Sequence, residues 1–307
     1  MKDQIIALLL YFDVFEYPLR EKEIYKYLHL SPEERDIASE CLQNLVNAGL
    51  INRNGNYFYL GTGLAKVSRR KEANELARKR MKTATRFSKI ISWFPFVRGV
   101  YLSGSLSKGA MKKDDDIDYF IVTEPGRLWI ARTLLTLFKK VFLLNSYRNF
   151  CINYFVDTNN LRVEEHNRYT ATEIVFLMPV YNYSIYQQML TENPWVKNYY
   201  PGFTKGRYLC GEGKPFLKNV LEKLFNVFGD RMENYLFAKS KRIIRAKFAP
   251  QGEEYIKNSF SIRRNELKYF PQQQKFSILE RFQSRAIKWQ QEGKAFVNLS
   301  PGNIYYL

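Results

Sequence analysis

Apolar residues recur every three or four positions along much of this chain, which is the spacing of one face of an α-helix. In the first third of the sequence, this spacing predicts helices over residues 3–14, 20–28, 31–49 and 64–93. Ser31-Pro32-Glu33-Glu34 strengthens the third of these predictions. A capping serine, a proline in the first turn and nearby acids all favour a helix start.

The first three helices are followed by a segment with a different pattern. Residues 50–60 consist of two short apolar runs separated by Asn54-Gly55-Asn56, a turn sequence typical of β-hairpins. Three helices and a hairpin in this order resemble a winged-helix domain. Winged helices commonly bind DNA through the third helix. Here residues 32–41 hold one arginine among four acids, which would repel phosphate, so a structural lid or a protein-contact role is favoured over DNA binding.

The middle of the chain alternates between strand-like and helix-like patterns. An apolar run ends at Gly104-Ser105, a polar segment follows, and a second apolar run carries Asp116 and Asp118. The pattern then predicts a helix over residues 127–144 and a third strand over residues 150–156.

From Tyr169 onward the pattern predicts helices. Thr170 and Glu173 have the spacing of a capping pattern before an apolar run that stops at Pro179. Further helices are predicted over residues 181–190, 216–248 and 274–291, with an extended tail at residues 295–307. Residues 201–215 are rich in glycine and proline and mark a domain junction.

Asp116 and Asp118 are the first residues that point to a chemistry. Residues two apart on a strand point to the same face, so these carboxylates are expected to converge. Two adjacent carboxylates repel each other unless a cation lies between them. Mg²⁺ is the usual ion at such an oxygen-only pair, with nucleotide phosphates completing its coordination. Backbone N–H groups at the Gly104-Ser105 turn would favour the same anion.

This pattern resembles the signature of the nucleotidyltransferase superfamily, the group with the DNA polymerase β-like fold. The resemblance rests on Gly104-Ser105, ten intervening residues, and Asp116-Ile117-Asp118, with the extra glycine of the small bacterial members at Gly109. It implies an NTP substrate and a Mg²⁺ or Mn²⁺ cofactor. It also implies site residues: nucleotide binding by Gly104, Ser105 and Lys108, and catalysis and metal binding by Asp116 and Asp118.

The third predicted strand departs from the family pattern. Active members usually place a third carboxylate there, as a metal ligand and a base. Strand alternation puts Asn153 at that position, and an amide cannot accept a proton at neutral pH. Asp157 is a substitute only if the strand is displaced or bulged, and Glu164 and Glu165 are more remote candidates.

Composition and charge limit the class of protein. The chain has 307 residues, 46% hydrophobic residues and a formal charge of +18. Residues 1–60 hold six Lys/Arg and nine Asp/Glu, a net charge of −3. The remaining residues hold 42 Lys/Arg and 21 Asp/Glu, a net charge of +21. This basic field suits a polyanionic substrate. Three scattered cysteines indicate a reducing compartment. The apolar N-terminal run is too short to span a bilayer, so the expectation is a cytoplasmic protein without a membrane partner.

The sequence thus predicts an α+β protein with a nucleotidyltransferase-like mixed sheet. The expected domains are a winged-helix-like domain, a connecting helix, the catalytic domain and a helical C-terminal region, at residues 1–62, 63–94, 95–200 and 201–307. The expected reaction is Mg²⁺-dependent transfer from an NTP to an acceptor hydroxyl of a small molecule, a protein or RNA. The alternative is a nucleotide-binding regulatory protein with weak or no catalysis, whose winged helix contacts DNA or protein.

Overall fold

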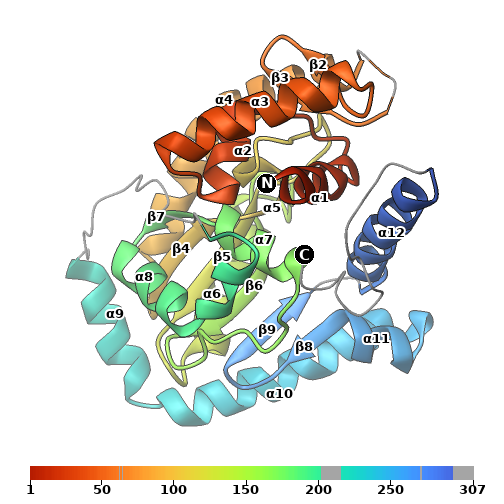
Figure 1. The fold of residues 1–307 in the computed structure, drawn as a ribbon. Coiled ribbons are helices and arrows are strands. Elements are labelled where there is room, and N and C mark those ends of the chain that lie inside the picture. Colours follow the sequence, from red (N-terminus) through yellow and green to blue (C-terminus); the bar gives the residue numbers. More distant parts are fainter. Residues whose placement is uncertain (62, 64, 202–215, 270–271, 293–307) are drawn as a thin grey trace.

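Two sheets and the helices around them organise the chain (Figure 1). The computed structural model describes residues 1–61, 63, 65–201, 216–269 and 272–292, apart from the side chains of Asn153 and residues 272–276. The predicted junction at residues 202–215 and the predicted tail at residues 295–307 lie outside the described residues.

The N-terminal region forms three helices and a small antiparallel sheet with the strand order β1-β3-β2. In chain order its elements are α1 (Lys2–Asp13), β1 (Leu19–Arg20), α2 (Glu21–Leu28), α3 (Pro32–Asn47), β2 (Asn52–Asn54) and β3 (Tyr57–Tyr59). Ser31 caps α3 as predicted, since its side chain accepts a hydrogen bond from the Glu34 N–H. The predicted helices and hairpin are therefore present, and the winged-helix resemblance itself stays a prediction.

A six-stranded mixed sheet forms the centre of the molecule, with the strand order β7-β4-β5-β6-β9-β8. The strands are β4 (Val97–Leu102), β5 (Asp118–Thr123), β6 (Cys151–Asp157), β7 (Met178–Tyr181), β8 (Phe260–Ile262) and β9 (Glu266–Tyr269). β5 and β6 are parallel, while the other neighbours are antiparallel. Mixed sheet and helices together confirm the predicted α+β class.

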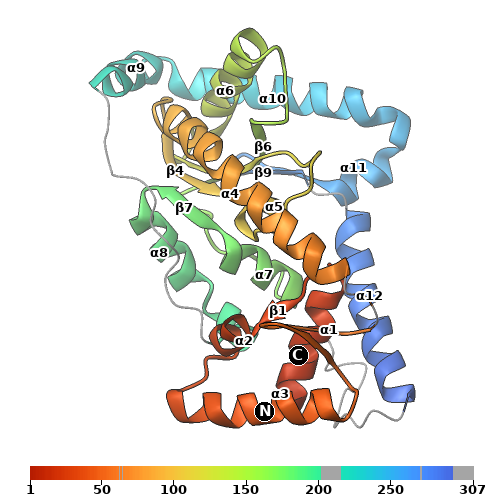
Figure 2. The same ribbon diagram turned by 90° about the horizontal axis from the view of Figure 1, so that it is seen from above.

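Each face of this sheet is buried in its own core. Tyr101 and Phe120 point into one core, which extends to α1–α3 and to the helices α7 (Arg168–Phe176), α8 (Tyr183–Glu192) and α12 (Gln272–Gln291). Val100 and Ile121 point into the other core, which is covered by α4 (Ala65–Ser92), α6 (Leu128–Phe142) and α10 (Gly229–Phe248). Figure 2 shows α1–α3 and α10 on opposite sides of the sheet.

The chain beyond Tyr169 contains more strand than its pattern predicts. The predicted helix over Thr170–Pro179 ends at Phe176, and β7 follows at the edge of the sheet, paired with β4. Pro179 is tolerated there because an edge strand needs no N–H donor on its outer side. The cap of α7 is Asn167, whose side chain accepts a hydrogen bond from the Thr170 N–H, so the capping pattern of Thr170 and Glu173 was wrong.

The C-terminal region is helical but also adds two strands to the sheet. The hairpin β8–β9 extends the sheet beyond β6, and these strands are too short for the periodicity to reveal. The remaining elements are η1 (Pro194–Asn198), α9 (Phe216–Asn226), η2 (Ala249–Gln251) and α11 (Glu253–Ser259). No helix among the described residues is long and apolar enough to cross a membrane.

α6 and α10 are joined by a buried carboxylate. The Glu233 side chain accepts hydrogen bonds from the N–H groups of Trp129 (2.8 Å) and Ile130 (2.9 Å) in the first turn of α6. These N–H groups have no partner within their own helix, and an anion at a helix N-terminus is stabilising. Burial raises the pKa of the Glu233 carboxyl, and the two N–H donors oppose this effect.

We expect Glu233→Ala to lower the free energy of unfolding by about 2–4 kcal/mol, because it leaves two buried N–H groups without an acceptor. Asp230→Ala is the control, since the exposed ion pair between Asp230 and Arg127 contributes less than about 1 kcal/mol. Urea unfolding followed by circular dichroism measures both variants. Equal losses in the two variants would contradict the assigned role of Glu233.

Candidate functional site

Gly104 and Asp118 lie in direct contact at the end of the central strands. β4 leads into α5 (Gly104–Ser107), and β5 begins beside it at Asp118. Gly104 has a φ of +66°, and a Cβ added there would overlap the Oδ2 atom of Asp118. The Ser103 N–H also donates to the Asp118 carbonyl at 3.0 Å. Glycine is therefore required at the turn for both its backbone conformation and its lack of a side chain.

The Asp118 carboxylate is half-buried in a polar cluster. Its pKa is raised to about 6, mainly because burial disfavours the charged form. A hydrogen bond with Cys151 lowers the pKa and the charge of Asp116 raises it, with smaller effects from Lys108 and Glu173. The charges of Asp116 and Lys108 thus act on the Asp118 carboxyl, and the shared metal and nucleotide site of these residues stays a prediction. Cys151 and Glu173 are additional neighbours.

Asp116 lies in the loop before β5, two residues before the strand begins. The expectation that strand alternation aligns both aspartates was therefore wrong in detail, because β5 begins at Asp118. A long-range contact holds this loop instead. The Arg80 guanidinium of α4 donates to the Asp115 carbonyl and to the side chain of Asn149 at 3.0 Å. α4 thus supports the segment that carries Asp116.

Lys108 follows α5 and is held inside the site. Its ammonium group donates to the Gly104 carbonyl at 3.3 Å and pairs with the Glu173 carboxylate at 2.9 Å. Ser105, the other predicted nucleotide-binding residue, is half-buried in α5. Its carbonyl accepts a hydrogen bond from the Ala110 N–H at 2.9 Å and closes the turn.

Residues 81–178 match the family model of the nucleotidyltransferase domain. The chain contains a nucleotidyltransferase domain. The matched range includes every site residue predicted from the sequence, and it supports nucleotidyl transfer as the general activity. No curated protein and no solved structure matches the chain.

The N-terminal region contacts the nucleotidyltransferase domain directly behind Lys108. The Tyr17 hydroxyl donates to the Lys108 carbonyl at 2.6 Å, and the Arg70 guanidinium donates to the Gly109 carbonyl at 3.0 Å. Arg70 is buried, lies over the Tyr17 ring and pairs with Glu23 at 3.1 Å. Residues 63–94 were expected to form a connecting helix, and their sequence pattern did not indicate that Arg70 and Arg80 point inward.

β6 supplies no carboxylate beside Asp118 among its described side chains. Cys151 lies opposite Asp118, and an irregularity follows, because Ile152 pairs with Tyr119 but Tyr154 pairs with Phe120. Asn153 is the extra residue of this bulge. The unbroken alternation that assigned Asn153 to the third position is therefore absent, and its side chain lies outside the description.

The other candidates for the third position lie elsewhere. Asp157 pairs with Thr123 at the far end of β5, roughly 17 Å along the strand from Asp118. Its proposed substitution for the third carboxylate was therefore wrong. Glu164 and Glu165 pair with Arg263 (3.6 Å) and Lys268 (3.9 Å) of the C-terminal hairpin.

The side chains of the site fit a divalent cation through two carboxylates. A half-buried Asp118 with a raised pKa, under the influence of the Asp116 charge, would be stabilised by a cation, and oxygen ligands suit Mg²⁺ and Mn²⁺. Among the described residues no group of three or more His, Cys, Asp or Glu side chains surrounds one point. Phosphate oxygens would thus have to supply part of the coordination.

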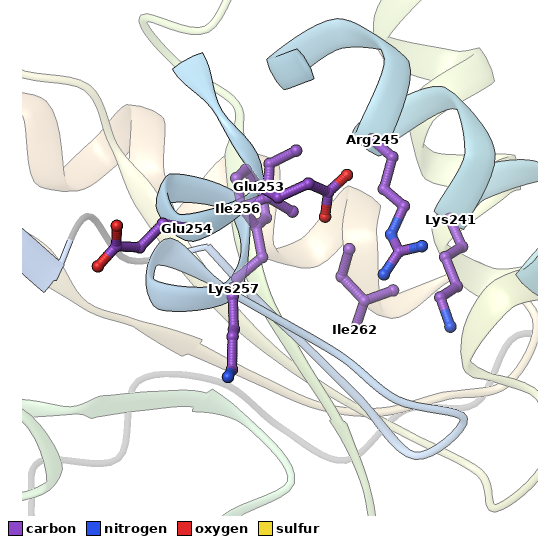
Figure 3. A pocket seen from close by; sticks show the side chains of 8 residues that line it. Lys241, Arg245, Glu253, Glu254, Ile256, Lys257 and Ile262 are labelled. Atoms are coloured by element: carbon purple, nitrogen blue, oxygen red, sulfur yellow. The ribbon is translucent and has the colours of Figure 1, made fainter. Parts of the chain in front are cut away.

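A cavity of about 570 Å³ lies between α10, α11 and β8, away from this site. Figure 3 shows Lys241 and Arg245 of α10 on one wall, with Ile262 beside them and Lys257 on α11. The cavity shares no lining residue with the aspartate site.

A phosphate bound at this site would compete with Glu173 for the Lys108 ammonium group. We expect Glu173→Gln to lower the NTP dissociation constant by up to about fivefold, because a partly exposed pair is worth up to about 1 kcal/mol. Titration of the protein with the common NTPs measures the change. Glu40→Gln on the exposed side of α3 is the control. Weaker NTP binding by Glu173→Gln would show that Glu173 does not restrain Lys108.

Proposed function

We propose that the chain transfers a nucleotidyl group from an NTP to an acceptor hydroxyl, with Mg²⁺ or Mn²⁺ as cofactor. The single observation that supports this best is the contact between Gly104 and Asp118, which places a glycine turn against a half-buried carboxylate. That turn suits phosphate, and the carboxylate suits a cation. An acceptor hydroxyl then attacks the α-phosphorus in line and pyrophosphate leaves.

Each site residue has a role in this proposal. Asp116 and Asp118 hold the cation, which would neutralise phosphate charge when bound. Gly104 and Ser105 form the turn that approaches the phosphates. Lys108 moves from Glu173 to a phosphate oxygen and adds a positive charge. Positioning and electrostatics provide most of the catalysis in phosphoryl chemistry, so this small set is sufficient.

The N-terminal region acts in this proposal as a structural support for the nucleotide turn. Tyr17 and Arg70 fix the carbonyls of Lys108 and Gly109 from behind. α3 exposes acids that would repel phosphate, so a protein contact is favoured over DNA binding. The acceptor is a small molecule, a protein or RNA.

A second candidate function is nucleotide binding with weak or no turnover. It is favoured by β6, where Cys151 lies opposite Asp118 in place of a carboxylate. Neither a thiol hydrogen-bonded to a carboxylate nor a neighbouring amide replaces the missing base.

Label transfer separates the two functions. The full chain is incubated with α-³²P-labelled NTPs, Mg²⁺ or Mn²⁺, and a cell extract as the source of acceptor. Pyrophosphate release together with label on an acceptor supports the enzyme. NTP binding without either product, with wild type and Asp116→Asn behaving alike, supports the regulatory protein.

A further inference from the structure

α9 places polar side chains against the protein and apolar side chains in the solvent. Lys218 is buried and donates to the carbonyls of Ser92 (2.8 Å) and Val97 (2.6 Å). Glu222, one turn further on, pairs with Arg98 at 2.7 Å. The helix is therefore attached to the domain by ionic and polar contacts.

The opposite face of α9 is apolar and exposed. Its large side chains, each between 43% and 82% exposed, are Phe216, Leu217, Val220 and Leu224, followed by Val227 just beyond the helix. Their spacing places them within one stripe of the helix. Exposed apolar patches of this kind mark interaction surfaces, and the polar attachment of α9 keeps this stripe outward.

α10 continues this surface with a cationic stripe. Arg231, Tyr235, Lys239 and Arg242 are exposed and recur every three or four positions, on one face of the helix. Figures 1 and 2 show α9 and α10 following each other along one side of the molecule, away from α1–α3. We call these exposed side chains, from Phe216 to Arg242, the α9–α10 outer face.

Each acidic residue of residues 216–248 is either paired with an arginine or buried. Residues 216–248 contain eight Lys or Arg and three acids. Glu222 pairs with Arg98, Asp230 pairs with Arg127 at 2.7 Å, and Glu233 is buried against the first turn of α6. The α9–α10 outer face therefore combines apolar side chains with uncompensated positive charge.

We propose that the α9–α10 outer face binds the surface of a bilayer that contains anionic phospholipids. Helices with an apolar stripe and flanking cations lie in the membrane interface, and juxtaposed Lys and Arg are attracted to anionic headgroups. A second copy of the chain fits less well, because the cationic stripes of the two copies would meet. A nucleic acid fits less well too, because Leu217, Val220, Leu224 and Val227 are aliphatic and offer bases little stacking surface.

This contact needs no membrane-spanning segment, so it agrees with the lack of such a helix among the described residues. It departs from the expectation of no membrane partner, which considered spanning segments alone. The proposal does not rest on the proposed reaction. It would place an acceptor that is itself at the membrane surface within reach of the enzyme.

Vesicle co-sedimentation of the full chain tests the proposal. We expect binding to vesicles of phosphatidylcholine with phosphatidylglycerol and little binding to vesicles of phosphatidylcholine alone. Leu224→Glu and the double variant Lys239→Glu/Arg242→Glu should each weaken binding about tenfold. Ile37→Glu on α3 is the control for the apolar change, since Ile37 is 57% exposed and Leu224 is 65% exposed. Lys22→Glu/Lys26→Glu on α2 is the control for the charge change.

Three results would overturn the proposal. If the wild-type protein does not co-sediment with the anionic vesicles, the α9–α10 outer face is not a membrane-binding surface. Equal losses in test and control variants would mean adsorption through net charge. A dimer in light scattering that Leu224→Glu dissociates, without vesicle binding by the wild type, would assign the face to a second copy of the chain.

Discussion

Asp118→Asn is expected to reduce pyrophosphate release roughly 10³-fold, because a metal-bound carboxylate supplies several kcal/mol of transition-state stabilisation. Asp118 is the half-buried carboxylate that contacts the Gly104 turn. Asparagine has nearly the same shape, so the loss would reflect charge and not packing. Steady-state rates with saturating NTP and Mg²⁺ measure the effect. An activity within about threefold of wild type would contradict the role of Asp118.

The same substitution should stabilise the metal-free protein at neutral pH. The pKa of Asp118 is raised from 3.8 to about 6, so the folded protein binds more protons than the unfolded chain between these values. The contribution of Asp118 to the free energy of unfolding therefore falls as the pH rises from about 4 to 6, and is constant above that range. Asp118→Asn removes this destabilising contribution, so the variant's free energy of unfolding at pH 7 should be higher by up to roughly 3 kcal/mol. Urea unfolding in EDTA at pH 4 and pH 7 checks the sign, and a destabilised variant at pH 7 would contradict it.

Gly104→Ala is expected to reduce activity roughly 10²–10³-fold and to destabilise the fold by about 1–3 kcal/mol. The new Cβ would overlap Asp118 Oδ2, and alanine would also adopt a φ of +66°. The carboxylate must move away, and the nucleotide turn loses its contact. Rates and urea unfolding measure the two effects.

Gly126→Ala is the matched control for this prediction. Gly126 has a φ of +68°, with nothing within 4 Å of an added Cβ. It carries the same backbone strain without the contact, so it should lose stability but keep activity. Equal activity losses at Gly104 and Gly126 would mean that strain alone, and not the contact with Asp118, explains the effect.

The candidate site residues that lie close together in the sequence were proposed from local patterns alone. Gly104, Ser105, Asp116 and Asp118 occur within 15 positions, at a spacing that a family signature preserves. The helix starting at Ser31 was predictable for the same reason, since its cap is encoded in four consecutive residues.

The remaining features depend on contacts between distant segments. Glu173 is 65 residues from Lys108, and its local spacing with Thr170 suggested a cap instead of an ion pair. Arg80 supports the loop at Asp115, 35 residues away, by donating to its backbone carbonyl. Every residue has a backbone carbonyl, so such a contact cannot be predicted from the sequence pattern. The bulge at Asn153 shifts the pairing of β6 by one residue, and periodicity assumes that no such shift occurs.

The central claim is that Gly104, Asp116 and Asp118 form one metal and nucleotide site. A crystal structure of the full chain with Mn²⁺ and a non-hydrolysable NTP analogue tests it most directly, because the anomalous signal locates the metal. The account predicts an anomalous peak bound by Asp116 and Asp118, with the analogue's phosphates against the Gly104-Ser105 turn and within reach of Lys108. Mn²⁺ or nucleotide bound elsewhere, for example in the cavity lined by Lys241 and Arg245, with the aspartates unliganded, would contradict it.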